Sequence, residues 1–172
     1  RVNENMDISA GLHAQYFSLS NSISPAEPRV GMKYRMKGSQ SISAGAGMHS
    51  QIQPIYTYTF DKNGNGDYYN KNMDFTRSLH TVLGYEKFFD KGFSIKTEAY
   101  YQHLYNVPVE VNASSFSMIN MGSGFSRIFA EKLQNTGTGY NYGLELTVQK
   151  YFDKSFFFLF SWTLYESNFT GS

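Results

Sequence analysis

One stretch of the sequence matches the beginning of a calcium-binding loop. Asp61, Asn63 and Asn65 have the spacing of the pattern D-x-N-x-N-G, and Gly66 completes it. Side-chain oxygens at positions one, three and five of such a loop converge on a hard cation. Position twelve is Asn72, where a calcium loop has a bidentate glutamate. Two interpretations stay open: a calcium site in residues 61–72, or an Asn- and Gly-rich loop tip.

Two histidines and three basic residues are candidates for contact with a ligand. His49 and His80 could bind a metal ion or an anionic substrate group, because imidazole is both a metal ligand and a titratable base. Arg29, Lys33 and Arg35 form a basic stripe that could attract an anionic substrate. The alternative for both sets is structural. The histidines would then be ordinary polar residues of an interior, and the basic side chains would pair with neighbouring acids.

No arrangement of residues indicates catalysis. The sequence has no Gly-x-Ser-x-Gly motif, and no spacing singles out a nucleophile with its base. Cysteine is absent, which excludes thiolate chemistry and a disulfide framework. A formal net charge of +1 does not indicate nucleic-acid binding, which usually requires a strongly basic surface. We therefore expect neither an enzyme nor a nucleic-acid-binding protein.

The elements that must position these residues are predicted to be β-strands with two different faces. Between residues 140 and 149 the even positions are apolar and the odd positions are polar or glycine. Such a period of two places apolar side chains on one face of a strand. The alternating run is longer than the roughly 5–6 residues usual in soluble proteins. Strands of about 9–11 residues, apolar outside and polar inside, are what a tilted strand needs to cross a membrane.

The same pattern predicts seven strands and places the candidate residues on their polar faces. His49 and His80 fall at the ends of adjacent strands, and the basic stripe lies along one strand. The predicted strands are 6–16, 29–36, 41–49, 78–89, 93–104 and the two arms of a hairpin within 138–168.

Cross-strand neighbours must point to the same side of a sheet, so the parity of the apolar positions predicts the register. With a turn of Asp153–Ser155, it places Phe152 opposite Phe156 and Leu146 opposite Trp162. With a three-residue turn at 90–92, it pairs Phe89 with Phe93 and places Glu86 opposite Lys96.

Loop lengths and composition indicate a membrane barrel. The turns at 38–40, 90–92 and 153–155 are short, whereas the intervening connections are long. Short turns on one rim and long loops on the other are typical of outer-membrane barrels. An aromatic content of 17% with a mean hydropathy of −0.43 fits aromatic girdles around a wet interior. The sequence has no signal peptide and begins at Arg1 within strand-like sequence, which predicts a segment of a longer, processed protein.

Several stretches resemble TonB-dependent outer-membrane receptors, in the second half of their barrel. The most specific is Asn135–Thr147, and the similarity covers most of the chain apart from the loop tips. The resemblance implies an all-β fold. Residues 1–172 would form one segment, about seven to eight strands, of an antiparallel transmembrane β-barrel of about 22 strands. The plug domain is not part of this segment. The other similar stretches are Gly11–Phe17, Glu27–Gly31, His49–Pro54, Tyr100–Gln102 and Val107–Val109.

The function that the resemblance implies is active import across the outer membrane of a Gram-negative-type cell. The nutrient would be a siderophore, cofactor, glycan or peptide. The energy would come from the TonB complex of the inner membrane, acting through the N-terminal plug region. Lipid surrounds such a barrel, and a surface lipoprotein could sit on the long loops at 51–77 and 105–137, where we expect ligand or partner contact. The alternatives are a passive porin-like channel, an outer-membrane enzyme and a soluble β-rich binding module.

Overall fold

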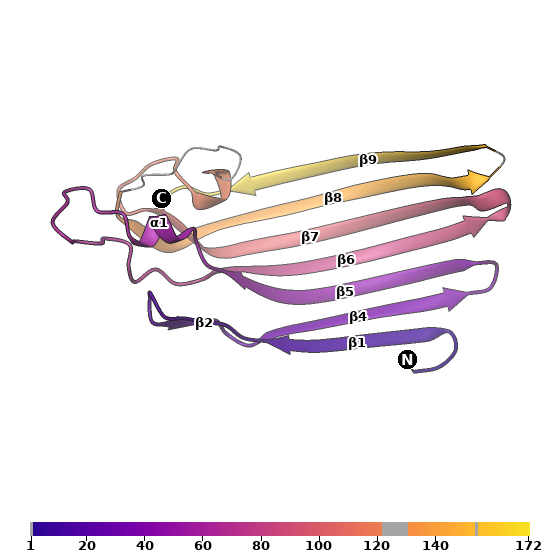
Figure 1. Cartoon of the computed structure of the whole chain (residues 1–172), viewed down its shortest axis with the longest axis horizontal. Helices are drawn as coiled ribbons and strands as arrows, with labels where there is room; N and C mark the ends of the chain where they lie inside the picture. The colour runs from indigo at the N-terminus through magenta and orange to yellow at the C-terminus, as the bar shows by residue number, and fades with distance from the viewer. Residues whose placement is uncertain (1, 122–130, 154) are drawn as a thin grey trace.

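The computed structural model describes residues 2–121, 131–153 and 155–172, and one antiparallel sheet dominates it. Seven strands lie side by side in the order β1-β4-β5-β6-β7-β8-β9 (Figure 1). The all-β prediction with an antiparallel sheet is therefore confirmed, and the sheet is open, with β1 and β9 as its edges. The strands are β1 Met6–His13, β4 Glu27–Met36, β5 Gln40–Gln51, β6 Thr76–Phe89, β7 Phe93–Glu110, β8 Leu133–Asp153 and β9 Phe156–Phe169.

The sheet has one apolar and one polar face because the register keeps like side chains together. Met32 lies opposite Ala44, and Leu146 lies opposite Trp162 as predicted. Lys96 lies opposite Glu86 on the other face, also as predicted. Since partners on adjacent strands point to the same side, these pairs extend two continuous faces across the sheet.

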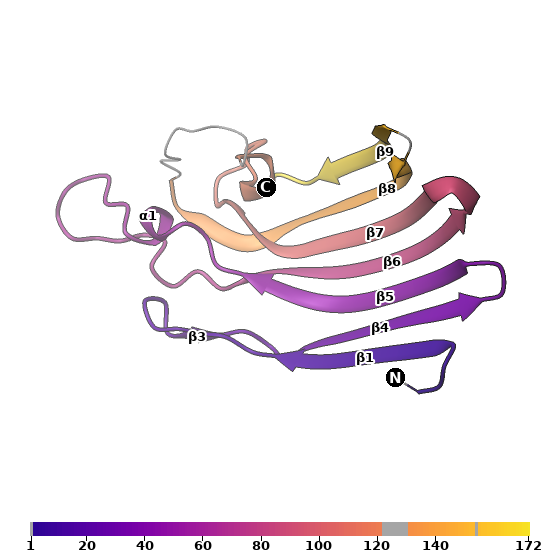
Figure 2. The ribbon, with the colours of Figure 1, turned by 45° about the vertical axis from the view of Figure 1, so that its right-hand side comes forward.

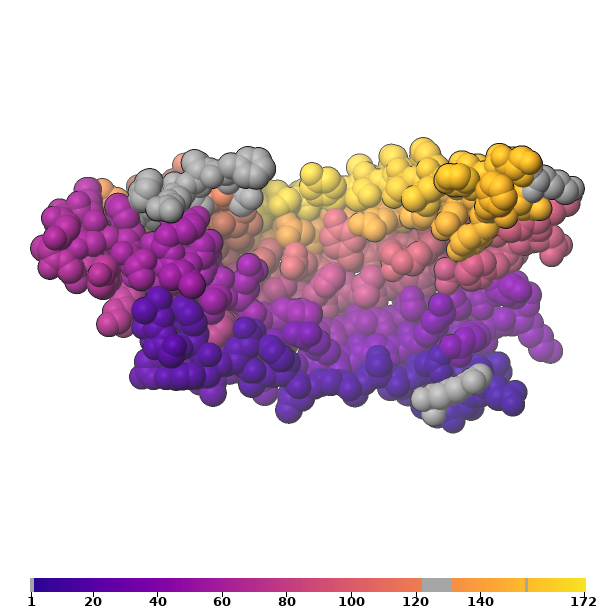
Figure 3. Space-filling view, viewed as in Figure 1, coloured from indigo at the N-terminus to yellow at the C-terminus, as the bar shows by residue number. Residues whose placement is uncertain are grey.

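No second layer covers the apolar face among the described residues. Leu83, Leu144 and Trp162 are 58%, 45% and 45% exposed. The sheet curves as a single layer along its length (Figure 2), and in the space-filling view the loops gather at its left-hand end (Figure 3). No helix in the described ranges has the length and apolarity needed to cross a membrane.

Short turns join the strands at one end of the sheet. Residues 37–39 connect β4 to β5, with Met36 opposite Gln40. The 3-10 turn η1, Asp90–Gly92, connects β6 to β7, with Phe89 opposite Phe93. Lys91 and Gly92 have φ +65 and +72, so both adopt the left-handed conformation that short hairpin loops use. The predicted alternation of short turns and long loops is confirmed at this end.

The turn between β8 and β9 differs from the prediction. Asp153, not Phe152, lies opposite Phe156, and the register shifts between Lys150 and Asp153. A β-bulge adds one residue to a strand. With this extra residue, a shorter turn can join β8 to β9 while apolar side chains still lie opposite apolar side chains. The predicted turn at 153–155 is therefore wrong in its bounds; its central residue, Lys154, lies outside the described residues.

At the other end the long loops are more ordered than the sequence indicated. The predicted strand 6–16 ends at His13, and the chain then forms a small hairpin from β2, Tyr16–Phe17, and β3, Ser22–Ile23. β7 runs on to Glu110 and β8 begins at Leu133, so both ends of the predicted loop 105–137 are strand. The remaining loops hold the helix α1, Ile55–Tyr58, and the 3-10 turn η2, Met118–Met121.

These loops pack into a small hydrophobic cluster, which we call the loop cap. Tyr58, Met73 and Leu133 are buried at its centre, and Phe17 meets Tyr58 edge to face with 5.1 Å between ring centroids. Asn135 joins the loops by polar contacts, because its side chain accepts from the backbone N–H of Asp74 and donates to the Asp74 carbonyl. The loop cap thus connects the strands at the loop end of the sheet.

Candidate ligand-binding surface

A row of hydrogen-bonded side chains crosses the polar face close to the loop cap. The Ser167 hydroxyl donates to Asn141 Oδ1 over 2.6 Å, and Asn141 Nδ2 donates to Gln102 Oε1 over 2.8 Å. Gln102 Nε2 in turn donates to Ser78 Oγ over 3.0 Å. We call Ser78, Gln102, Asn141 and Ser167 the amide row. It connects β6, β7, β8 and β9, and the strand alternation places all four side chains on the same face.

Two adjoining cavities lie along this row. The first, about 290 Å³, is lined by polar side chains that include His49, His80 and Gln102. The second, about 250 Å³, is lined by Asn141 together with aliphatic residues of β7 and η2. Both cavities share Gln51, Thr76 and Leu104 in their lining, so they form one trough from the histidines to the loop cap.

The structure brings the two candidate histidines into the same cavity. His49 lies opposite Ser78 on the neighbouring strand, and His80 lies opposite Gly47. The His80 ring packs edge to face against Tyr100, with 6.4 Å between ring centroids. In the described part of the chain, no three His, Cys, Asp or Glu residues gather where they could hold a metal. The histidines therefore supply two imidazoles to the trough, and metal binding stays a prediction.

Each member of the basic stripe pairs with an acid. Arg29 Nη2 lies 3.2 Å from Glu27 Oε2, and Arg35 pairs with Asp7. Lys33 Nζ lies 3.1 Å from Glu86 Oε2, across the intervening strand β5. β5 carries serine on this face at positions 41 and 43, and these small side chains leave room for the contact. The stripe therefore carries compensated charge, which is the structural alternative considered above.

Glu27 is a polar centre that the sequence analysis missed. Its side chain is fully buried at the loop end of β4, where Oε2 lies 3.1 Å from His13 Nδ1 and Oε1 accepts from Gln15 Nε2 over 3.4 Å. Gln15 also donates to the carbonyl of Ser50 on β5. The signal in the sequence was the Glu27–Arg29 spacing, since residues two apart on a strand share a face.

The predicted calcium loop is held by its own backbone. Asp61 Oδ1 accepts from the N–H groups of Asn63 and Gly64, and Oδ2 accepts from the Gly66 N–H. These hydrogen bonds, with that of Gly66 first, hold the pKa of Asp61 below its ordinary value. Asn65 Oδ1 likewise accepts from the N–H of Asp67. Such Asx turns account for the loop conformation, and calcium binding at 61–72 stays a prediction.

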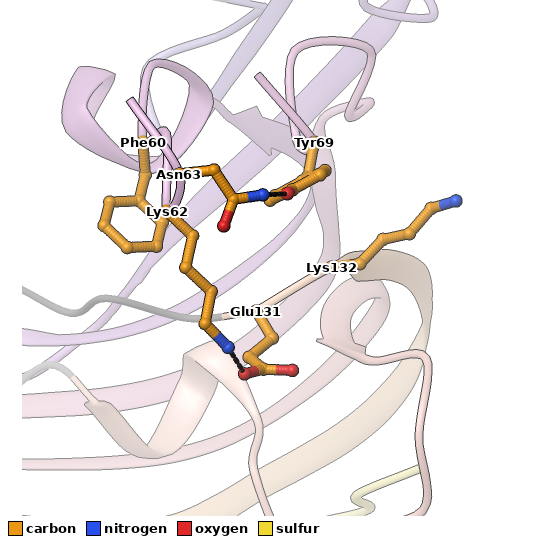
Figure 4. Close-up of a pocket in the computed structure, with 6 residues that line it drawn as sticks. All are labelled: Phe60, Lys62, Asn63, Tyr69, Glu131 and Lys132. Carbon is orange, nitrogen blue, oxygen red and sulfur yellow. Dashed lines mark hydrogen bonds and ion pairs between the residues drawn. The ribbon is translucent and has the colours of Figure 1, made fainter. Parts of the chain in front are cut away.

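A separate groove of about 320 Å³ lies between the two long loops (Figure 4). Lys62 forms an ion pair with Glu131 across it, and this hydrogen bond raises the pKa of Lys62. Asn63 Nδ2 donates to the hydroxyl of Tyr69 over 2.6 Å. Phe60 and Lys132 complete the lining. The Lys62–Glu131 ion pair thus connects loop 52–75 to the residues just before β8.

No protein-family model matches this chain, and no curated protein matches it in sequence. The chemistry of the surface is therefore inferred from its geometry. The trough offers side-chain amides, hydroxyls and imidazoles on a rigid sheet, which suits reversible binding of a polar ligand.

Proposed function

We propose that this chain forms part of the wall of an outer-membrane receptor barrel that imports a scarce nutrient. One observation carries the proposal: a long antiparallel sheet with an uncovered apolar face and a charge-compensated polar face. Short turns at one end and long loops at the other support the same orientation as in outer-membrane barrels, with the turns toward the periplasm.

The apolar face is better suited to lipid than to water. Large apolar side chains stand exposed on it from edge to edge, as at Ile8, Val30, Leu83, Leu144 and Leu164. A continuous apolar surface of this extent is rare on soluble monomers. In hydrocarbon the same surface costs nothing, and the antiparallel pairing satisfies the backbone groups of neighbouring strands over most of the sheet. A tilted strand of about 9–11 residues crosses a bilayer, so β7 and β8, at 18 and 21 residues, are long enough to span it and continue outward.

Aromatic and lysine side chains at the turn end match a membrane interface. Phe93 packs edge to face on Phe158, with 5.9 Å between ring centroids. Lys87 Nζ lies 4.9 Å from the ring centroid of Phe89. Aromatic rings and lysines gather at the level of lipid headgroups in membrane proteins. Lys150 behaves differently from a snorkelling lysine, because its side chain is buried and Nζ donates to the carbonyl of Lys91 in the neighbouring turn.

Energised import is supported by the sequence resemblance rather than by the sheet. On this proposal the polar face lines the interior. The loop cap stands at the outer mouth and offers a surface for a lipoprotein partner. The energy comes from the TonB complex of the inner membrane through a plug domain. A passive porin-like channel would use the same wall, so a functional assay must separate the two.

Labelling at consecutive positions tests the membrane wall. The chain contains no cysteine, so single cysteines can be placed at 144, 145, 146 and 147 and spin-labelled in the full receptor in lipid. Labels at 144 and 146 should be accessible to oxygen, which concentrates in lipid. Labels at 145 and 147 should be accessible to a water-soluble nickel complex. Accessibility without a period of two, or with the faces exchanged, would refute the wall.

Deletion of the energising complex tests active import. Cells that take up a nutrient through the intact receptor should lose that uptake when the TonB complex is removed. Uptake that continues unchanged would identify a passive channel and overturn energised import while leaving the barrel wall intact.

A further inference from the structure

The charged side chains beside the amide row are already paired with side chains of opposite charge. Arg77 lines the cavity of the histidines, and its Nη2 lies 2.8 Å from Asp74 Oδ2. Arg29, beside Gly47 at the same end of the face, is paired with Glu27. A charged ligand would have to compete with these ion pairs. An uncharged ligand would not, so the electrostatics of the trough favour a neutral ligand.

The amide row leaves hydrogen-bonding capacity unused. A primary amide offers two N–H donors and two acceptor lone pairs. Within the row, Asn141 and Gln102 each donate one hydrogen bond and accept one. Among the described residues, each amide therefore keeps one donor and one acceptor position for a ligand, in an orientation fixed by its neighbours. Both positions lie on adjacent strands, which are about 4.8 Å apart.

We infer that the amide row binds a neutral oligosaccharide, which would be the imported nutrient if the proposed receptor function holds. Hydroxyl groups both donate and accept, so vicinal hydroxyls match the paired donor and acceptor left on each amide. Leu104, Val107 and Ile119 line the adjoining cavity and can cover the C–H face of a sugar ring. The residues of an extended peptide that crosses the strands are about 3.3 Å apart. This spacing does not match the distance of about 4.8 Å between neighbouring strands. A pyranoside carries hydroxyls around its ring and can present a vicinal pair to an amide.

Binding to the purified full receptor tests this inference. Calorimetric titrations would use neutral glucans, mannans and galactans, with polygalacturonate, ferric citrate and an uncharged alanine peptide as the other chemical classes. At least one neutral glycan should bind. The variant Gln102→Leu keeps the size of the side chain but removes both donor and acceptor, so it should weaken that binding about 10-fold.

Gln149→Leu is the matched control. Gln149 lies on the same face, eight residues from Asn141 along β8, or about 27 Å at the rise of a strand. It should leave glycan binding unchanged, and heat-dependent gel mobility will report whether each variant is folded. Asn141→Leu gives a second variant should Gln102→Leu fail to fold.

Each outcome decides the inference. Glycan binding that both row variants weaken and Gln149→Leu preserves supports it. Glycan binding insensitive to the row, binding of the peptide or an anion in place of glycans, or no binding by the folded receptor overturns it. The spin-label periodicity and the TonB dependence of uptake are independent of these titrations, so the receptor function can survive the loss of this inference.

Discussion

A single arginine placed on each face of β8 distinguishes a lipid-facing wall from a sheet in water. Leu146 lies between Trp162 on β9 and Thr97 on β7, and Tyr142 and Lys150 stand four residues away on either side. In the proposed barrel, at about 3.4 Å per residue and a tilt of about 40°, each would lie about 10 Å from Leu146 along the membrane normal. Leu146 is thus at the centre of the apolar band.

We expect Leu146→Arg to lower the free energy of unfolding by about 2–4 kcal/mol, the cost of arginine at the bilayer midplane. That corresponds to about 30- to 700-fold in the equilibrium constant. Glu145→Arg is the matched control at the next residue, on the polar face. Glu145 lies opposite Glu98, so the substitution replaces two facing carboxylates with an opposite-charge pair and should change stability by less than about 1 kcal/mol.

Urea titration of the full receptor refolded in lipid vesicles measures both variants, with tryptophan fluorescence and heat-dependent gel mobility as readouts. Equal effects of Leu146→Arg and Glu145→Arg would refute the two-faced wall. A larger effect of Glu145→Arg would show that the faces are exchanged.

Three further predictions concern the ends of the sheet. Asn135→Ala removes the hydrogen bonds that join the loops and should destabilise the loop cap by about 1–3 kcal/mol, seen as faster proteolysis of the loops. The Gly66 N–H and its neighbours lower the pKa of Asp61, so the carboxylate stabilises its loop above the ordinary pKa of 3.8 and that contribution is lost as the pH falls below this value. Hydrogen exchange of residues 61–67, corrected for intrinsic rates, should show this transition, and Asp61→Asn should abolish it. Lys150→Met leaves the Lys91 carbonyl without its donor and should cost about 1–3 kcal/mol in urea titrations, whereas an unchanged midpoint would show that Lys150 does not hold the two turns together.

The alternation of side chains was enough to predict most of the sheet. Because partners share a face, the parity of the apolar positions, together with three-residue turns, placed Leu146 opposite Trp162 and Phe89 opposite Phe93. Parity failed at the β8–β9 turn, where it demanded a three-residue turn. A bulge there satisfies the same constraint with fewer turn residues, and bulges leave no periodic signal.

The candidate site was predictable only in part. Parity placed His49 and His80 on one face, and the structure brings them into one cavity. The amide row and the loop cap depend on contacts between residues far apart in sequence, such as Gln102 with Asn141. No local pattern encodes such contacts. The basic stripe and the Glu27–Arg29 spacing were visible in the sequence, but the compensation of the stripe by Asp7 and Glu86 required the register of β1, β4, β5 and β6.

The order of strands bears on how the chain is assembled. In the seven-stranded sheet, every strand from β4 onward pairs with the next strand along the chain, and β1 is separated from β4 only by the small β2–β3 hairpin. Among the described residues, no strand pairs with a strand from a distant part of the sheet, although residues paired across the loops after β5 and β7 are as far apart in sequence as Gln40 and Lys87 or Phe93 and Lys150. Growth can therefore proceed one hairpin at a time, each new arm using the exposed edge of the last as its template. A nick in the loop after β5 should accordingly yield two pieces that recombine along the β5–β6 seam.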